Sequence, residues 1–402
     1  MIGEVRIENY KSIQKLKLEL GRVTVLIGEN GCGKSNILEA IALASAAAND
    51  KLDNEFLAAR GIRVTEPRFM RSAFEMENLV KDIKIDIREN EGENFTYILQ
   101  NDNSPYSKWA DKNLYERHFL AKDFDKSMET QNLLSTKPKN QHEEISLELL
   151  IKSLKKDALQ NPKIQKLLLG LESINRMLSP ANLINFTIYS PENQALRTFE
   201  KEGQIQPLGI NGEGLFKLIK FLNSETNQDK LNQIKGKLRL IDWFRDFEVP
   251  EDLSPLQSSL QIKDKYLDTD LTYFDQKSSN EGFLFLLFYF ALFISDLTPK
   301  FFAIDNIDAS LNPRLCRRLM QELVELAKKY DKQVIFTTHN PAVLDGLDLE
   351  DDEQRLLVIS RNQLGYTKAR RILGPKPLEG QEPVELSEAF LRGYIGGLPK
   401  NF

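Results

Sequence analysis

The stretch "RVTVLIGENGCGKSNILEAIALASAAA", residues 22–48, decides the fold. It opens with an apolar run, passes through a glycine-rich turn and continues as an alanine-rich segment with helical spacing of its apolar residues. A continuous apolar run indicates a strand buried on both faces, and alanine favours a helix. The stretch therefore predicts a central β-strand, a loop and a helix in direct succession.

The loop of this stretch fits the pattern G-x-x-x-x-G-K-[ST] at residues 28–35. Between a strand and a helix, the backbone N–H groups of such a loop cradle phosphates at the positive end of the helix. We predict that Lys34 reaches the β and γ oxygens of ATP and that Ser35 binds Mg²⁺. The predicted nucleotide contacts are Glu29, Asn30, Gly31, Cys32, Gly33, Lys34, Ser35 and Asn36. The alternative, a glycine-rich turn of chance composition, is disfavoured by the flanking strand and helix.

The composition of the 402 residues excludes several classes of protein. A net charge of -5 argues against a broadly basic surface, so any contact with DNA has to be local. Two cysteines and three scattered histidines give neither a disulfide framework nor zinc spacing, which favours a reducing cytosol. The N-terminus lacks a signal-peptide pattern, and the apolar run 283–294 is too short to cross a bilayer. We expect a cytoplasmic protein without a membrane contact.

Strand-like and helical segments alternate along the rest of the chain, which predicts an α/β fold. Residues 1–100 are expected to form one lobe with the glycine-rich loop and a β-hairpin, and residues 182–402 a second lobe. Between them, residues 101–181 are polar and predict a helical insertion whose segments are too short for a long coiled coil. In the second lobe we expect strands at 183–190, 258–264 and 267–274, and a helix over 231–247.

Two further motifs carry candidate catalytic residues. In "FFAIDNID", residues 301–308, an apolar strand ends at Asp305, which is the expected partner of Ser35 for the metal. In "IFTTHNP" the next strand ends before His339, whose imidazole can accept or donate a proton near neutral pH. A solvated Asp in a turn and a structural His are the plainer alternatives.

Taken together, "VRIENYKSI", the glycine-rich loop, "FFAIDNIDASLNPRL" and "TTHNP" resemble the ABC-type P-loop ATPase heads of the SMC, RecF and OLD kinds. The resemblance implies a head with a mixed central sheet, an antiparallel β subdomain and an inserted helical subdomain. Long coiled coils are missing, and about sixty residues after His339 leave no room for the nuclease domain fused to OLD-type heads. The chain therefore looks most like the stand-alone ATPase subunits of prokaryotic anti-phage defence systems.

The resemblance also implies three further site residues. In "KSSNEGFLF", Ser279 and Gly282 resemble the signature that contacts the ATP of a partner subunit, although their spacing differs from the usual motif. A plain helix N-cap is the alternative for this segment. In "TIYSPENQAL", Gln194 is our choice for the metal-sensing glutamine, and an exposed turn is the alternative.

Asn306 stands where most members of this superfamily have a glutamate that polarises the attacking water. An amide cannot accept that proton, so we expect slow ATP hydrolysis, supported by Asp308 or His339. The resulting prediction is a homodimer or higher oligomer closed by ATP and Mg²⁺ that controls a separately encoded nuclease or toxin. The alternative is a RecF-like ATPase that acts directly on DNA.

Two basic clusters offer candidate phosphate contacts, although such runs usually lie on solvated faces. The first comprises Arg60, Arg63, Arg68 and Arg71, and the second comprises Arg361, Lys368, Arg370, Arg371 and Lys376.

Overall fold

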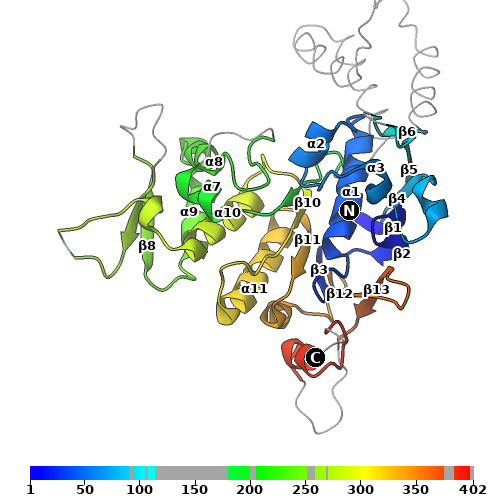
Figure 1. Ribbon diagram of the computed structural model, residues 1–402. Coiled ribbons are helices and arrows are strands. Elements are labelled where there is room, and N and C mark those ends of the chain that lie inside the picture. The colour runs from blue at the N-terminus through cyan, green and yellow to red at the C-terminus, as the bar shows by residue number, and fades with distance from the viewer. Residues whose placement is uncertain are drawn as a thin grey trace, which may run out of the picture.

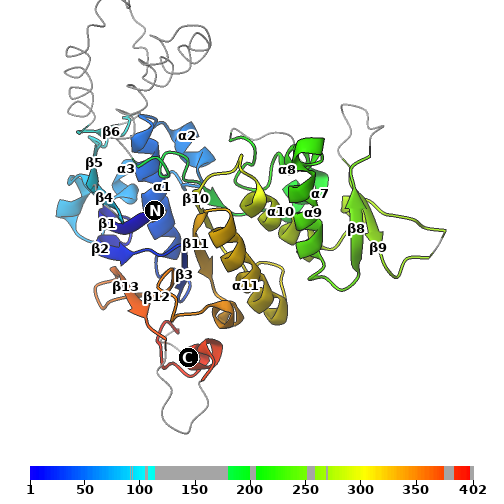
Figure 2. The same cartoon turned by 180° about the vertical axis from the view of Figure 1, so that it is seen from behind.

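The computed structural model describes residues 1–90, 92, 94–104, 107–113, 180–199, 205–250, 259–268, 270–374 and 384–398. The helices predicted for the insertion at residues 101–181 lie outside these residues. Figures 1 and 2 show an elongated molecule with an antiparallel sheet at one end, a mixed sheet in the middle and a helical group with a small hairpin at the other end.

The antiparallel sheet has the strand order β2-β1-β4-β5-β6, and its last strand extends the N-terminal lobe beyond residue 100, into the start of the predicted insertion. Its strands are β1 (Ile2–Tyr10), β2 (Ile13–Glu19), β4 (Ile83–Glu89), β5 (Asn94–Gln100) and β6 (Ala110–Asp111). The predicted hairpin is confirmed, because β4 pairs antiparallel with β5. Buried and exposed residues alternate along β2 and β5, as in a sheet with one face on the core.

The mixed sheet has the strand order β13-β12-β3-β11-β10-β7. Its strands are β3 (Val23–Ile27), β7 (Ile188–Tyr189), β10 (Phe301–Ile304), β11 (Gln333–Thr338), β12 (Gln354–Arg361) and β13 (Thr367–Ile372). All pairings are parallel except that of β12 with β13. As predicted, β3 is central, between β11 and β12, and fully buried. The carboxyl ends of the parallel strands consequently meet at one edge, which we call the carboxyl edge.

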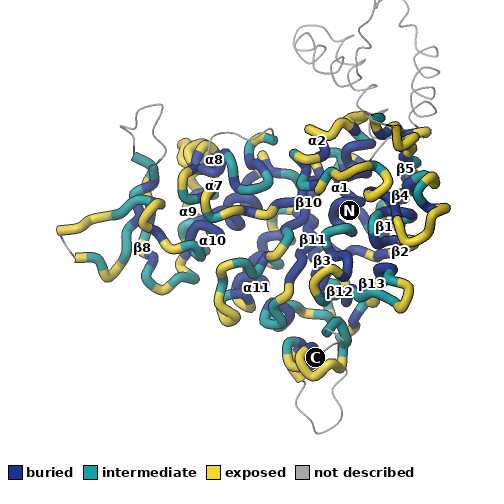
Figure 3. Tube along the Cα trace, viewed as in Figure 1, coloured by how far each residue is buried: buried dark blue, intermediate teal, exposed yellow. Residues whose placement is uncertain are grey.

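Helices cover both sheets. The longer ones are α1 (Lys34–Ala48), α8 (Leu215–Leu222), α9 (Gln228–Leu238), α10 (Glu281–Ile294) and α11 (Pro313–Lys329). The shorter ones are α2 (Asn54–Ala59), α3 (Pro67–Met70), α7 (Asn193–Thr198), α12 (Leu386–Leu391), η1 (Met76–Leu79), η3 (Glu225–Asn227), η4 (Gln276–Ser278) and η5 (Pro341–Gly346). Helix α1 is buried between the two sheets, which explains its small alanine side chains (Figure 3).

Three of the elements predicted for the second lobe differ in the structure. The strand expected at 183–190 is reduced to β7, and the helix expected over 231–247 ends at Leu238. Residues Phe244–Glu248 instead form β8, which pairs with β9 (Gln261–Asp264). In the described residues 267, 268 and 270–274, the expected strand is reduced to one bridge, because Asp264 and Asp268 accept backbone N–H groups two residues ahead and form turns.

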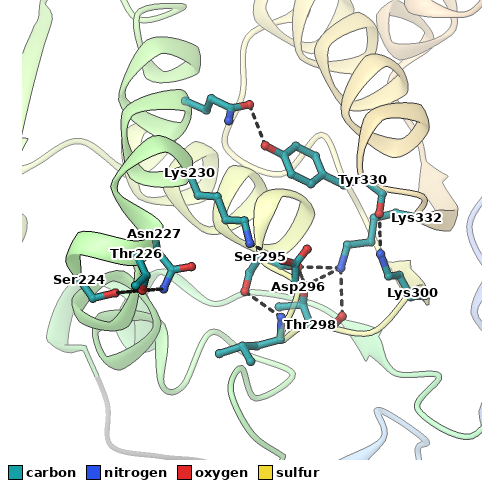
Figure 4. Close-up of polar contacts among 12 residues, drawn as sticks. Ser224, Thr226, Asn227, Lys230, Ser295, Asp296, Thr298, Lys300, Tyr330 and Lys332 are labelled. Carbon is teal, nitrogen blue, oxygen red and sulfur yellow. Dashed lines mark hydrogen bonds and ion pairs between the residues drawn. The ribbon is translucent and has the colours of Figure 1, made fainter.

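Helix α10 is buried on every side over residues 283–294, and Lys332 anchors the turn that follows it. The Lys332 amine is itself buried and donates to the carbonyl oxygens of Ser295, Thr298 and Pro299 and to the Thr298 hydroxyl (Figure 4). Burial, helped by the charge of Lys300, lowers the pKa of Lys332 to about 7. This cage ties the C-terminal end of α10 to the start of β11. Among the described residues, no helix is long and apolar enough to span a membrane.

Candidate nucleotide-binding site

The glycine-rich loop joins β3 to α1 and adopts a backbone conformation that requires glycine. Gly31 and Gly33 have φ values of 75° and 107°. A Cβ at Gly33 would come within 2.2 Å of Thr367 Oγ1 and 2.8 Å of Ser12 Oγ. The loop is therefore held from one side by β13, and its backbone N–H groups at the start of α1 form an anion-binding end.

Lys34 is buried and crosses the loop from the first turn of α1. Its Nζ donates to the carbonyl oxygens of Gly28, at 2.9 Å, and Glu29, at 3.2 Å. Burial lowers the pKa of this amine, and the nearby Asp305 and Asp308 carboxylates act in the opposite direction. The amine is the one cation within the loop itself, so it is placed to meet the terminal phosphates of a nucleotide.

Ser35 and Asp305 meet at the carboxyl edge, as the sequence predicted. Ser35 Oγ lies 3.0 Å from Asp305 Oδ2, and the Thr337 hydroxyl donates to the other carboxylate oxygen. The backbone N–H of Asp305 also donates to the Tyr189 carbonyl in β7. The hydroxyl and carboxylate oxygens fit Mg²⁺, which is typically held by one or two carboxylates together with substrate phosphates.

Asn306, Asp308 and His339 lie around the same edge. Asn306 has a φ of 57°, which asparagine tolerates better than most residues, and its side chain is exposed. Asp308 accepts a hydrogen bond from the Thr338 hydroxyl at 2.6 Å. Partial desolvation, followed by the charge of Lys34, lowers the pKa of the surface residue His339. The lowered pKa favours the neutral imidazole, which can accept a proton.

A pocket of about 390 Å³ adjoins the end of the loop at Asn36. Its other lining residues are Lys11, Ser12, Arg63, Thr65, Phe69, Arg71, Ala73, Phe74 and Arg361. The pocket combines cations, hydroxyls and two aromatic rings, a lining suited to the sugar and base of a nucleotide. Sequence reasoning missed this pocket, although Lys11 and Ser12 lie within the "VRIENYKSI" motif.

A chain of hydroxyls joins this pocket to the loop. Asn36 Nδ2 donates to Ser12 Oγ at 2.7 Å, Ser12 Oγ lies 2.7 Å from Thr367 Oγ1, and the latter donates to the Cys32 carbonyl at 2.8 Å. The antiparallel sheet, the loop and β13 are thereby linked through side chains.

Glu39, buried in α1, holds the two cations at the mouth of the pocket. It accepts hydrogen bonds from Lys11 Nζ, from Arg63 Nε at 2.5 Å and from the Tyr10 hydroxyl at 3.1 Å. Arg63 Nη2 also donates to Asn36 Oδ1 at 3.1 Å. Glu39 thus orients Lys11 and Arg63 beside the glycine-rich loop.

The segment that resembles the family signature, residues 277–285, lies at the N-terminus of α10. Asn280 caps the helix, because its Oδ1 accepts from the Phe283 N–H at 2.8 Å, so the N-cap alternative holds for Asn280. Ser279 precedes the cap, and its carbonyl accepts from Arg197 Nη1 at 2.8 Å. A Cβ at Gly282 would lie 3.5 Å from Leu311. In the described part of the chain, no hydrogen bond joins this segment to the glycine-rich loop.

Gln194 is exposed in the first turn of α7, and no hydrogen bond connects its side chain to Ser35 or Asp305 within the described ranges. The same helix carries Arg197, which the sequence analysis missed. Arg197 Nη1 also donates to the Lys277 carbonyl, and Nε lies 3.3 Å from Asn193 Oδ1. Arg197 therefore connects the segment after β7 to the start of α10.

The basic clusters are largely engaged in internal contacts. The guanidinium of Arg60 donates to the Phe186 carbonyl at 3.0 Å, and that of Arg71 donates to the Lys81 carbonyl at 2.7 Å. Arg370 binds the Ile395 carbonyl. The remaining members include Arg371, which pairs with Asp352, and Lys376, which lies outside the described residues. The prediction of a phosphate-binding face gains no support from this arrangement.

Residues 23–345 match the AAA_21 family, described as "AAA domain, putative AbiEii toxin, Type IV TA system". The chain belongs to this family. The match begins at β3 and ends in η5, so it contains the glycine-rich loop, Asp305 and His339. This AAA_21 protein is thus a P-loop ATPase of the ABC class that includes SMC and RecF proteins, as the sequence motifs predicted.

Comparison with individual proteins supports the same fold. A solved Smc head bound to the C-winged helix domain of ScpA covers 92% of the AAA_21 chain and 98% of its own, with a TM-score of 0.52 and 15% identity. The uncharacterized protein MJECL10 of Methanocaldococcus jannaschii is 30% identical over 143 residues, or 32% of this chain. RecF of Bacillus thuringiensis is 38% identical over 55 residues, or 13% of this chain. The matches span 65% of MJECL10 and 15% of RecF.

Proposed function

We propose that this AAA_21 protein binds ATP and Mg²⁺ at the carboxyl edge. The observation that carries the proposal is the 3.0 Å contact between Ser35 and Asp305, which brings the metal-binding oxygens of two distant motifs together. Residues 29–36 would hold the phosphates, and Ser35 and Asp305 would hold the metal. Bound Mg²⁺ neutralises developing phosphate charge. Gln194 is retained as a candidate metal sensor that would have to move to reach the site.

The second part of the proposal is a head-to-head dimer that forms when ATP is bound. Ser279 and Gly282 lie at the N-terminus of a fourteen-residue helix, where an anion is favourably placed. The segment makes no hydrogen bond with the nucleotide loop of its own chain in the described ranges. Both observations support a role for this end of α10 at the γ-phosphate held by a second copy.

Hydrolysis in such a dimer is proposed to be slow. Asn306 supplies no proton acceptor, and its exposed side chain lies next to Asp305 in the chain. Among the described residues, Asp308 and His339, whose lowered pKa favours the neutral imidazole, are the candidates to accept a proton at this edge. A long-lived ATP-bound dimer follows from this combination.

The dimer is proposed to scaffold or restrain a separately encoded nuclease or toxin in antiviral defence. The family description, which mentions a toxin and a type IV toxin–antitoxin system, supports a role in a toxin module. Co-expression with the product of the neighbouring open reading frame tests this part. We expect a nuclease or toxin that copurifies with the wild type and is released or activated when Lys34 is replaced by alanine.

A RecF-like action on DNA is the second candidate, and the 55-residue match to a DNA replication and repair protein favours it. Its test is binding of the isolated protein to duplex DNA at two salt concentrations. Phosphate contacts release counterions, so a DNA-binding protein loses affinity steeply as salt rises. No binding at low salt would reject this candidate and leave ATP binding untouched.

ATP binding itself is tested by titration with a fluorescent ATP analogue in the presence of Mg²⁺. We expect saturable binding by the wild type and none by the Lys34→Ala variant. Binding that is unchanged in the variant contradicts the proposed site.

A further inference from the structure

The C-terminal part of the described chain, Leu386–Leu398, packs against the nucleotide site, although neither the sequence motifs nor the family match include it. Its helix α12 lies on η5, which begins two residues after His339. The Ser387 N–H donates to Asp345 Oδ1 at 2.8 Å, and Glu385, just before the helix, pairs with Arg317 of α11 at 2.8 Å. In Figures 1 and 2, α12 is the red helix near the C-terminal label, below the mixed sheet.

A row of paired residues leads from the nucleotide loop to this segment. Ile27, the last residue of β3, pairs with Val358 of β12, which pairs with Arg370 of β13. The Arg370 guanidinium donates to the carbonyl oxygen of Ile395. Two residues later the backbone of Gly397 reaches Gly28, the first residue of the loop.

Gly397 packs tightly against Val358 and Phe390 and lies next to Gly28. A Cβ at Gly397 would lie 3.6 Å from the Gly28 Cα, 2.9 Å from Val358 Cγ1 and 3.1 Å from a ring carbon of Phe390. The φ of Gly397 is +86°, which also favours glycine. Any larger residue at this position presses on the side chains next to Gly28.

Gly28 holds Lys34, the cation proposed to bind the phosphates. Its carbonyl accepts from Lys34 Nζ at 2.9 Å. Movement of Gly28 therefore changes where Lys34 points. The C-terminal segment thus touches the loop at Gly28 and the chain after His339 at η5.

We infer that Leu386–Leu398 is a positioning element of the nucleotide site, in which Gly397 holds Gly28 and thereby sets the affinity for ATP. The inference rests on the proposed binding of ATP at the glycine-rich loop. It assigns these residues no contact with the nucleotide. Their action passes through Gly28 and η5.

The chain offers a matched pair of glycines for the test. Gly393 and Gly397 both have positive φ values, 76° and 86°, so alanine is similarly strained at either position. A Cβ at Gly393 would meet only Leu398 Cδ1, at 3.8 Å, and that contact is an ordinary one. Gly393→Ala therefore controls for backbone strain, and Gly397→Ala adds the pressure on Val358, which pairs with Ile27 just before the loop, and on Phe390.

The two variants are compared with the wild type by titration with a fluorescent ATP analogue and by thermal unfolding. We expect Gly397→Ala to bind the analogue about tenfold more weakly, because small displacements of positioning groups have large effects. Gly393→Ala should stay within about twofold of the wild type. Both variants should unfold at similar temperatures. Equal affinity of Gly397→Ala and the wild type overturns the inference.

A charge-based pair removes the dependence on strain. Asn and Asp have the same shape and both tolerate positive φ, so Gly397→Asn and Gly397→Asp differ chiefly in a carboxylate beside the phosphate end. We expect the Asp variant to bind the analogue at least about threefold more weakly than the Asn variant, with a smaller difference at high salt. Both variants should bind the analogue more weakly than the wild type, because either side chain displaces Val358 and Phe390, and an Asn variant that binds as the wild type does contradicts the inference.

Arg370→Ala provides a test that leaves the glycines intact and removes an exposed side chain. It should weaken binding of the analogue by releasing the Ile395 carbonyl, and unchanged affinity counts against the proposed path. A wild-type protein that fails to bind the analogue rejects the proposed function itself. If the wild type binds the analogue and only the Gly397 and Arg370 variants bind it more weakly, the positioning role is supported separately from ATP binding itself.

Discussion

The carboxyl edge and the N-terminus of α10 are the two regions proposed to face the phosphates of ATP, and one chain completes them to different degrees. At the carboxyl edge, three segments that are far apart in sequence meet through the short contacts of Asp305 with Ser35 and Thr337. At the start of α10, Asn280 satisfies the helix end and Arg197 fixes the preceding loop. Within the described chain, no hydrogen bond connects this second region to the first.

The difference between the two regions shows which site residues the parallel strands alone can bring together. Their carboxyl ends share an edge, so the loop after β3 and the residues after β10 and β11 meet without further help. Helix α10 instead precedes β10 and presents its positive end elsewhere. We therefore expect variants of the first region to affect ATP binding or chemistry in a single chain, and variants of the second to affect assembly.

The largest effect is expected from Lys34→Ala, which removes the cation inside the loop. Affinity for ATP should fall by at least about 100-fold, because a charge-assisted contact with the terminal phosphates is lost. Calorimetric or fluorescence titration measures this. Lys263→Ala, on the β8–β9 hairpin, is the matched control and should bind as the wild type does.

Asn306→Glu should accelerate hydrolysis, since it restores a general base whose assistance is typically worth about 10² to 10⁴-fold. The gain should lie near the lower end, because glutamate at a φ of 57° costs about 1 to 2 kcal/mol of backbone strain. Steady-state phosphate release is the measurement. A fast wild type that this substitution leaves unaffected would show that the base lies elsewhere.

Asp308→Ala tests whether Asp308 serves as the general base in place of the missing glutamate at position 306. If Asp308 supports the residual rate, its removal should eliminate that rate while leaving ATP affinity within about threefold. If ATP binding is lost together with turnover, the substitution has instead disrupted the structure of the carboxyl edge by removing the hydrogen bond between Thr338 and Asp308.

Arg197→Ala addresses the second region and should act on assembly. Loss of the bonds to the Ser279 and Lys277 carbonyls releases the start of α10, and we expect ATP-dependent dimerisation to weaken about tenfold. Arg197→Lys, which keeps a donor, should recover part of the effect. ATP affinity of the monomer should not change, and a loss of ATP affinity in both variants would argue against the division into two regions.

The smallest effect concerns pH and is confined to the first region. Because the pKa of His339 is lowered on folding, the unfolded chain takes up the proton first as pH falls below about 6.5. This contribution to stability is present above that pH and is lost as pH falls through the lowered pKa. Since His339 is exposed, only a small decrease in melting temperature between pH 7.5 and 5.5 is expected. The decrease should be absent in His339→Gln.

Local pattern and strand order predicted much of the site. The glycine-rich loop, β3 and α1 follow from residues 22–48, and the meeting of Ser35 with Asp305 follows from parallel strands ending at one edge. The pocket at Lys11 and Arg63 was missed because it depends on Glu39, which gathers cations from separate segments.

Other parts depend on contacts that no local pattern reports. Residues after Leu238 continue an apolar spacing compatible with a helix, but they pair with β9 as a strand. Helix α12 is short, and its position depends on Asp345 and Arg317, which lie far away in sequence. Arg60 and Arg71 resemble surface cations in sequence, and only the folded chain shows them buried against carbonyl groups.

The most direct test of the central claim mixes two variants that are each defective in one region. Lys34→Ala disables the nucleotide loop. Gly282→Asp places a carboxylate at the start of α10, where a Cβ meets nothing closer than 3.5 Å and an acidic residue suits the helix end. Each variant carries a donor or acceptor dye, and energy transfer is followed after ATP and Mg²⁺ are added.

We expect the wild type to give ATP-dependent energy transfer and neither variant to do so with itself. A mixture of the two should regain the signal, because the intact loop of the Gly282→Asp chain faces the intact α10 of the Lys34→Ala chain. A mixture that stays silent while the wild type responds, or a Gly282→Asp variant that pairs with itself as the wild type does, would contradict a site shared between two chains.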